Sequence, residues 1–193
     1  MKKLLLVAAL IGFAGTARAA GPVYAGVHLD LSIYHDVDAS EAGGSATVSY
    51  DTGFGIGGVV GYRANPNFRF EGEISYRSAD VKSVGGTSVS GTSLSTTAFM
   101  VNGYYDFAQV KGPVVPFVGL GIGFINGNAS GFGQSYSDTE FGYQLTLGIS
   151  YAVNPNVSLV ADYRYQGASD FSSNGATLPY KSSNIQVGLN YLF

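Results

Sequence analysis

The last nine residues, Ile185-Gln186-Val187-Gly188-Leu189-Asn190-Tyr191-Leu192-Phe193, show the pattern that decides the fold. Gln186, Gly188 and Asn190 stand between apolar residues that recur at every second position. Successive side chains of a β-strand point to opposite faces, so this stretch predicts a strand with one apolar and one mostly polar face. The apolar positions are Ile185, Val187, Leu189, Tyr191 and Phe193.

The composition differs from that of an ordinary soluble domain. Charged residues make up 12% of the 193 residues, and 28 residues are glycine, whereas soluble domains average about 25% charged residues and about 7% glycine. The length fits a single domain. The absence of cysteine excludes disulfides and thiolate metal sites. Two histidines without cysteine do not favour a transition-metal site, and we expect no cofactor.

The N-terminus has the features of a secretory signal. Two lysines precede an apolar run at residues 4–14, and Ala17-Arg18-Ala19 forms a small-residue cleavage site. We expect residues 1–19 to be removed, which leaves residues 20–193 as one domain. Removal takes away three of the ten Lys and Arg residues, so seven basic residues face 13 acidic ones and the net charge is −6. This acidic balance argues against nucleic acid as a partner.

Seven further segments repeat the alternation of the C-terminal strand. They lie at residues 23–34, 54–63, 68–77, 99–107, 117–124, 140–153 and 157–166. After the signal segment, the most apolar run spans residues 112–125 and is too short for a membrane-spanning helix. A closed barrel can still cross a membrane because closure pairs every backbone N–H and C=O. Eight alternating segments, an even number, are typical of such a barrel.

Short and long connections alternate along the chain. Two of the short ones are Asn65-Pro66-Asn67 and Asn154-Pro155-Asn156, which have turn chemistry, and the third spans residues 108–113. The long connections, rich in Ser, Gly, Thr and Asn, span residues 36–51, 80–95, 126–138 and 167–181. Strict alternation gathers the short links and both termini at one end. We therefore expect an all-β, eight-stranded antiparallel up-and-down transmembrane β-barrel in the outer membrane, with periplasmic termini and four extracellular loops.

Three motifs carry a resemblance to a known family. They are Phe70-Glu71-Gly72-Glu73-Ile74-Ser75-Tyr76-Arg77, Pro116-Phe117-Val118-Gly119-Leu120-Gly121-Ile122-Gly123 and Tyr191-Leu192-Phe193. Over residues 20–193 the chain resembles the small eight-stranded outer-membrane β-barrels that include opacity-type surface proteins and the membrane domain of OmpA-like proteins. The resemblance implies that the apolar row of the last strand is a signal read by the barrel-assembly machinery. It does not imply one activity.

The interior of an eight-stranded barrel is just wide enough for side chains to fill it. Charged residues of both signs are predicted to face inward, where pairing offsets the cost of leaving water. Inward-facing glycines leave room for these long side chains. We also expect His28 to be a hydrogen-bonded lumen residue and His35 to lie at the rim. The expected lumen charge network is Asp30, Arg63, Arg69, Glu71, Glu73, Arg77, Asp162 and Arg164.

Catalytic and cofactor motifs have simpler structural interpretations. Residues 53–58 fit G-x-G-x-x-G, but the alternation that follows predicts a strand where that motif requires a helix. Glu71 and Glu73 have a spacing that suits paired carboxylates, yet the nearby arginines favour an ion network. Ser32 or Ser78 with a histidine would supply a nucleophile and a base, but no motif selects such a set.

Three classes of function follow. The leading hypothesis is a non-catalytic structural or adhesion-type surface protein whose loops contact host or other surface ligands. Its other partners are outer-membrane lipid and the barrel-assembly machinery. The second hypothesis is a narrow ion or small-solute channel along the polar lumen. The third, which the sequence favours least, is a lipid A-modifying enzyme.

Overall fold

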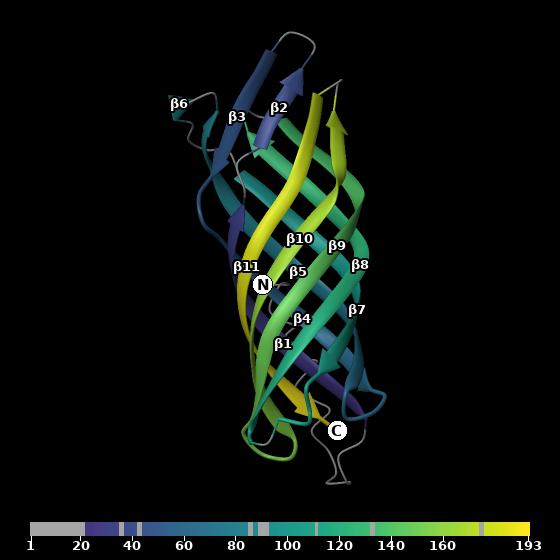
Figure 1. The fold of residues 1–193 in the computed structure, drawn as a ribbon. Coiled ribbons are helices and arrows are strands. Elements are labelled where there is room, and N and C mark those ends of the chain that lie inside the picture. Colours follow the sequence, from purple (N-terminus) through teal and green to yellow (C-terminus); the bar gives the residue numbers. More distant parts are fainter. Residues whose placement is uncertain are drawn as a thin grey trace, which may run out of the picture.

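The chain forms a closed antiparallel β-barrel in the computed structural model (Figure 1). The structure describes residues 22–34, 37–41, 44–84, 87–88, 93–110, 112–131, 134–173 and 176–193. The wall strands are β1 (Val23–Tyr34), β4 (Gly53–Arg63), β5 (Phe68–Val84), β7 (Ser93–Asp106), β8 (Val114–Gly131), β9 (Gln134–Ala152), β10 (Val157–Ser173) and β11 (Ala176–Leu192). The expected signal segment, residues 1–19, and His35 lie outside the described residues.

The barrel closes between its first and last wall strands. β1 pairs antiparallel with β11 from Tyr24 opposite Leu192 to Tyr34 opposite Ser182. Every other wall strand pairs with its neighbours in chain order. The expected all-β, eight-stranded antiparallel barrel is therefore confirmed.

The period-two pattern divides each strand between the outside and the lumen. Leu29 is 59% exposed, whereas the next residue, Asp30, is 3% exposed. Residues 53–58 lie in β4, so this glycine-rich motif is part of the barrel wall and opens no helix. None of the described residues belongs to a helix long and apolar enough to cross a membrane.

Much of the length of the four long connections is β-strand. β2 (Val37–Glu41) and β3 (Gly44–Tyr50) form a hairpin, and β6 (Thr87–Ser88) pairs with β5. β8 and β9 remain paired as far as Gly131 opposite Gln134. The strands thus extend far from the short turns at the opposite end of the barrel, as Figure 1 shows. Continued pairing satisfies backbone groups that an irregular loop would leave to water.

The β2–β3 hairpin continues the wall where β1 and β4 end. β3 pairs with β5 through Val48 opposite Val84, and β2 contacts β11 through Ser40 opposite Thr177. Beyond the ends of β1 and β4, the hairpin therefore fills the position in the wall between β5 and β11.

The two Asn-Pro-Asn turns are tight, as expected. Asn65 Oδ1 accepts hydrogen bonds from the backbone N–H groups of Asn67 and the residue after it, both at 2.9 Å. Asn67 also donates its side-chain amide to the carbonyl of Asp106 at 2.9 Å. The turn Asn154-Pro155-Asn156 repeats these contacts and donates to the carbonyl of Leu192 at 2.8 Å. Each turn thereby fastens the end of a neighbouring strand.

Inward-facing glycines leave the room that large lumen side chains need, which confirms that expectation. A Cβ atom added at Gly61 would overlap the ring of Tyr24, and one at Gly119 would overlap the ring of Tyr104. Both rings are buried. The outward-facing Gly72 differs, because no atom lies within 4 Å of the position of an added Cβ.

We predict that Gly61→Val destabilises the barrel, whereas Gly72→Val does not. The first change overpacks the lumen against Tyr24, which typically costs about 1–3 kcal/mol, and the second adds a side chain to open space on the lipid side. Urea unfolding of the refolded barrel, followed by its heat-dependent shift on a gel, measures both. Equal unfolding midpoints for the two variants would contradict the assigned faces.

Candidate functional site

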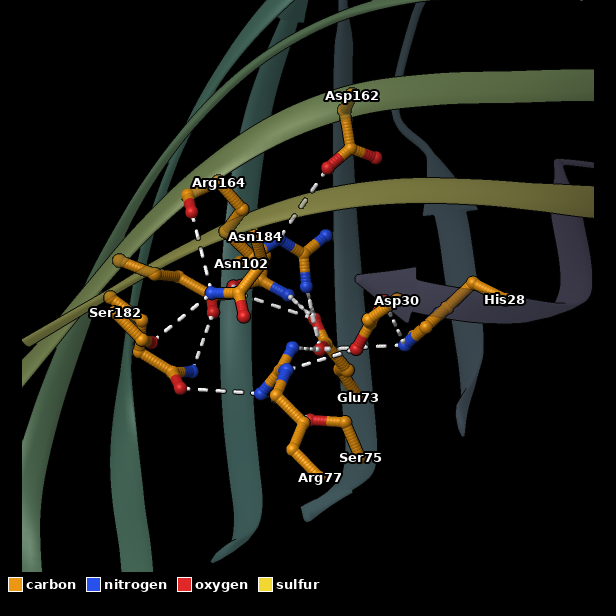
Figure 2. Close-up of polar contacts among 12 residues, drawn as sticks. His28, Asp30, Glu73, Ser75, Arg77, Asn102, Asp162, Arg164, Ser182 and Asn184 are labelled. Carbon is orange, nitrogen blue, oxygen red and sulfur yellow. Dashed lines mark hydrogen bonds and ion pairs between the residues drawn. The ribbon is translucent and has the colours of Figure 1, made fainter. Parts of the chain in front are cut away.

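Buried ionisable side chains meet in the middle of the lumen. We call this group the central charge cluster; its members are His28, Asp30, Glu73, Arg77, Asp162 and Arg164. They come from β1, β5 and β10, strands that are distant in sequence but face one another across the interior (Figure 2). Their positions share the inward parity of each strand. All six are buried.

Glu73 is the centre of this cluster. Arg164 Nη1 donates to both carboxylate oxygens of Glu73 at 2.6 Å. Asn102 donates its side-chain amide to Glu73 Oε2 at 2.9 Å, and Gln144 donates to the same oxygen at 3.2 Å. The carboxylate is therefore paired and hydrogen-bonded, as a buried charge requires.

Arg77 holds the other side of the cluster. Its Nε lies 2.9 Å from Asp30 Oδ2, and its Nη2 lies 4.0 Å from Glu73 Oε1. Arg77 Nη1 donates to Ser75 Oγ at 3.1 Å and to Gln166 Oε1 at 3.2 Å. Figure 2 shows the guanidinium groups of Arg77 and Arg164 both directed at Glu73. The central charge cluster thus ties β1, β5 and β10 together through side chains.

A second group lies nearer the short turns, and we call it the turn-end cluster: Tyr24, Arg69, Glu71, Tyr104, Asp106 and Phe117. Arg69 pairs with Glu71 and, at 3.0 Å, with Asp106. Its guanidinium carbon lies 3.9 Å from the ring centroid of Tyr104 and 4.5 Å from that of Phe117. Such ring contacts favour a desolvated cation. The turn-end cluster fills the lumen beside the short turns.

A third group lies in the lumen on the opposite side of the central charge cluster. This apolar layer consists of Tyr34, Ala79, Ala98, Met100, Ile125 and Tyr180. The rings of Tyr34 and Tyr180 pack edge to face at 6.0 Å. Tyr180 Oη donates to Gln166 Oε1 at 3.2 Å, which links the layer to Arg77. Apolar side chains that face inward in this way exclude water from this part of the lumen.

The inward positions of β5 show the order of the three groups. Arg69 and Glu71 belong to the turn-end cluster, Glu73 and Arg77 to the central charge cluster, and Ala79 to the apolar layer. Alternate residues of a strand are about 7 Å apart, so these groups follow one another along the barrel axis. The described side chains thus fill the lumen from the turn-end cluster to the apolar layer.

Seven of the eight residues expected in the lumen charge network lie in these clusters, and Arg63 does not. The Arg63 side chain is exposed, with its guanidinium carbon 5.8 Å from the ring centroid of Tyr24. Arg63 is the last residue of β4, where the side chain reaches the rim and water solvates its charge. Alternation along a strand indicates which face a side chain lies on, but it does not indicate how deep in the lumen the side chain lies.

His28 and Ser32, which the sequence analysis considered as a lumen residue and as a candidate nucleophile, both lie in the lumen. His28 is buried in the lumen as expected, but its Nε2 makes no hydrogen bond with the described residues. Its nearest carboxylate oxygens, on Asp30 and Glu73, are each 3.9 Å away. Ser32 is buried and its Oγ has no hydrogen-bond partner in the described part of the chain. Ser32 and His28 therefore do not form a nucleophile and base pair.

Uncharged amides that the sequence interpretation left out connect the clusters. Gln166 donates to Gln144 at 3.0 Å, and Gln144 donates to Asn102 at 2.6 Å. These amides stand at inward positions of three different strands. Extending the parity argument from charged to uncharged polar residues would have found them. Within the described residues, no group of three or more His, Cys, Asp or Glu side chains is placed to hold a metal ion.

The C-terminal strand presents its expected apolar row to the outside. Its five residues, Ile185, Val187, Leu189, Tyr191 and Phe193, are all exposed. Phe193 donates its backbone N–H to the carbonyl of Val23 at 3.0 Å, and its ring packs edge to face on Tyr191 at 5.3 Å. The row is thus available to lipid or to another protein along its full length.

Sequence and structure comparisons now identify the family. The family profile described as "Outer membrane protein beta-barrel domain" matches residues 4–193. The chain belongs to this family. An outer membrane protein of Gluconacetobacter diazotrophicus is 26% identical over 170 residues, which cover 77% of this chain and 44% of that protein. The outer membrane protein PagN of Salmonella typhimurium is 29% identical over 119 residues, 50% of this chain and 49% of PagN.

This outer-membrane barrel protein spans about half the length of these curated relatives. Among solved structures, Neisserial surface protein A has a TM-score of 0.64 and 24% identity, with 91% of this chain and 100% of that chain covered. That likeness concerns the fold alone. Family membership supports an outer-membrane location, so the exposed apolar face of the wall has lipid as its environment.

We predict that Arg164→Met destabilises the barrel by about 3–5 kcal/mol, because it leaves the buried carboxylate of Glu73 without its main partner. Urea unfolding of the barrel refolded in lipid vesicles measures the loss. Adding Glu73→Gln to this variant removes the unpaired charge and should restore much of the stability.

Arg63→Met provides the matched control. It removes an arginine at the exposed rim and should change the free energy of unfolding by no more than about 0.5 kcal/mol. Similar losses from the Arg63 and Arg164 variants would show that the central charge cluster does not carry the energy assigned to it.

Proposed function

We propose that this outer-membrane barrel is a non-conducting, non-catalytic surface protein whose wall anchors four hairpin extensions outside the cell. The extensions provide adhesion-type contact with host or other surface ligands. The observation that carries the proposal is a lumen filled by the turn-end cluster, the central charge cluster and the apolar layer in succession. A barrel filled in this way leaves its outer surface and its hairpins as the parts available for function.

The filled lumen argues against the narrow channel. Arg77 is 0% exposed and Arg164 is 2% exposed, and both are engaged with Glu73. An ion that enters from the short-turn end meets paired charges, and beyond them it meets the apolar layer around Met100 and Ile125. Passage would require breaking buried ion pairs and wetting an apolar constriction, and each step is costly.

The lumen also offers little support for the lipid A-modifying enzyme. Glu71 pairs with Arg69, and Glu73 pairs with Arg164, so the two carboxylates have structural partners. Each is buried away from the lipid face, where a lipid substrate would approach. A catalytic carboxylate has to reach its substrate.

The proposed orientation puts the short turns and the C-terminus in the periplasm and the extended hairpins outside. The lipid-facing row of β8 ends at Phe124, and Asn126 and Asn128 follow toward the hairpin. Asn126 donates to Thr139 Oγ1 at 2.8 Å across the pair, so polar contacts replace apolar ones beyond the belt. The orientation rests on short periplasmic turns and longer extracellular connections in such barrels. Export would use residues 1–19 as a cleaved signal, and insertion would use the apolar row of β11.

We predict that residues 20–193, refolded and checked by the heat-dependent gel shift, give no discrete current steps in planar bilayers. The lumen clusters leave no continuous aqueous path. An open porin in the same bilayers is the positive control. Reproducible steps whose ion selectivity changes in Glu71→Gln or Arg77→Met would overturn the non-conducting proposal and favour the narrow channel.

We predict that shortening at least one of the four hairpins removes most adherence of expressing cells to a host-cell monolayer. Each hairpin is cut back in turn to a two-residue Asn-Gly connection. The chain has no cysteine, so a single Ser137→Cys, labelled in intact cells with an impermeant maleimide, verifies surface display. Ala108→Cys, at a short turn, should remain unlabelled.

Unchanged adherence in all four shortened variants, and in a variant that combines them, would contradict the adhesion proposal. Labelling of Ala108→Cys but not Ser137→Cys in intact cells would instead reverse the proposed orientation. The two readouts thus separate the role of the hairpins from their side of the membrane.

A further inference from the structure

We propose that the lumen holds an ordered water molecule between the central charge cluster and the turn-end cluster, bound by Asp162, Arg164 and Gln186. The site lies on the inner face of β10 and β11. It is separate from the surface role proposed for the hairpins.

Three polar atoms at this place have no hydrogen-bond partner among the described residues. They are Asp162 Oδ1, Arg164 Nε and Gln186 Oε1. Each of the three residues is at most 7% exposed, so bulk water does not reach them freely. Leaving a buried polar group without a partner is costly, so three of them together call for a shared partner.

These three residues line one small cavity. About 20 Å³ of it is open to the centre of a water molecule. The opposite wall belongs to the turn-end cluster, through Arg69, Glu71, Tyr104 and Phe117. A buried water requires roughly 10–15 Å³ on this measure and two to four polar neighbours, so the cavity has the size and the lining for one water.

The distances across the site fit a bridging molecule. Asp162 Oδ1 and Arg164 Nε face each other at 3.7 Å, which is too long for a direct hydrogen bond (Figure 2). Gln186 stands directly opposite Asp162 in the β10–β11 register, so its amide enters the lumen at the same level. Polar groups separated by slightly more than a hydrogen bond are the usual setting of a water bridge.

The charge balance makes a monovalent cation the competing occupant. The two charged clusters contain five carboxylates, Asp30, Glu71, Glu73, Asp106 and Asp162, and three guanidinium groups, Arg69, Arg77 and Arg164. The unpartnered atoms decide between water and a cation. Arg164 Nε is a positively charged donor, which repels a cation, whereas Asp162 and Gln186 present acceptors. Only a molecule that both donates and accepts satisfies this mixture.

Nuclear magnetic resonance of the isotope-labelled barrel refolded in micelles tests the proposal. Magnetisation transfer from water to the Arg164 Nε–H should have the sign of a long-lived contact. The matched control is the Arg77 Nε–H, which lies in the same lumen but pairs with Asp30 at 2.9 Å and does not line the cavity. The transfer should be weak or absent there.

Gln186→Met provides the second measurement, because it replaces the amide oxygen with an apolar group of similar size. We expect the transfer to Arg164 to fall at least severalfold while the heat-dependent gel shift of the folded barrel persists. No transfer to Arg164 in the folded wild-type barrel would overturn the proposal. Anomalous density in the cavity of crystals soaked with Tl⁺ would also overturn it, in favour of a bound cation.

Discussion

The carboxylate of Glu73 is fully enclosed in the lumen, and much of the interior is arranged around it. A buried charge has to be paired and hydrogen-bonded, and Arg164, Arg77, Asn102 and Gln144 together meet that requirement. These partners come from four other positions on three further strands and on β5 itself. Glu73 therefore holds distant parts of the wall at fixed separations, in addition to the backbone pairing between neighbouring strands.

The narrow interior of an eight-stranded barrel explains why glycine is so frequent in this chain. Long side chains from one strand occupy space above the neighbouring strand, which therefore has glycine at the paired position. A Cβ at Gly57 would overlap the imidazole of His28, and one at Gly121 would overlap the amide of Asn102. The glycines thus define where the large polar groups lie. The outward-facing Gly72 has no such role, because no side chain lies close to it. Neighbouring side chains therefore require glycine at the inward-facing positions but not at Gly72.

Periodicity predicted the strands, their faces and the closure of the barrel, because the side-chain direction in a strand is a local property. The register between strands and the depth of a residue in the lumen depend on contacts between distant parts of the chain. The contact between Arg164 and Glu73 joins residues 91 positions apart, and no spacing in the sequence reveals it. Depth explains the error at Arg63, which has inward parity but lies at the rim. Continued pairing beyond the lipid belt explains why polar connections such as residues 126–138 are largely strands.

The interior changes character along its axis, and this order bears on what the barrel can do. The short-turn end and the middle are polar, whereas the layer around Ile125 and Tyr180 is apolar. The ion pairs of the middle join strands that are not neighbours in the wall, such as β5 and β10 through Glu73 and Arg164. The apolar layer contributes side chains that no ion or water molecule can bind strongly. For the surface role proposed above, this order means that the lumen supports the hairpins and takes no part in transport.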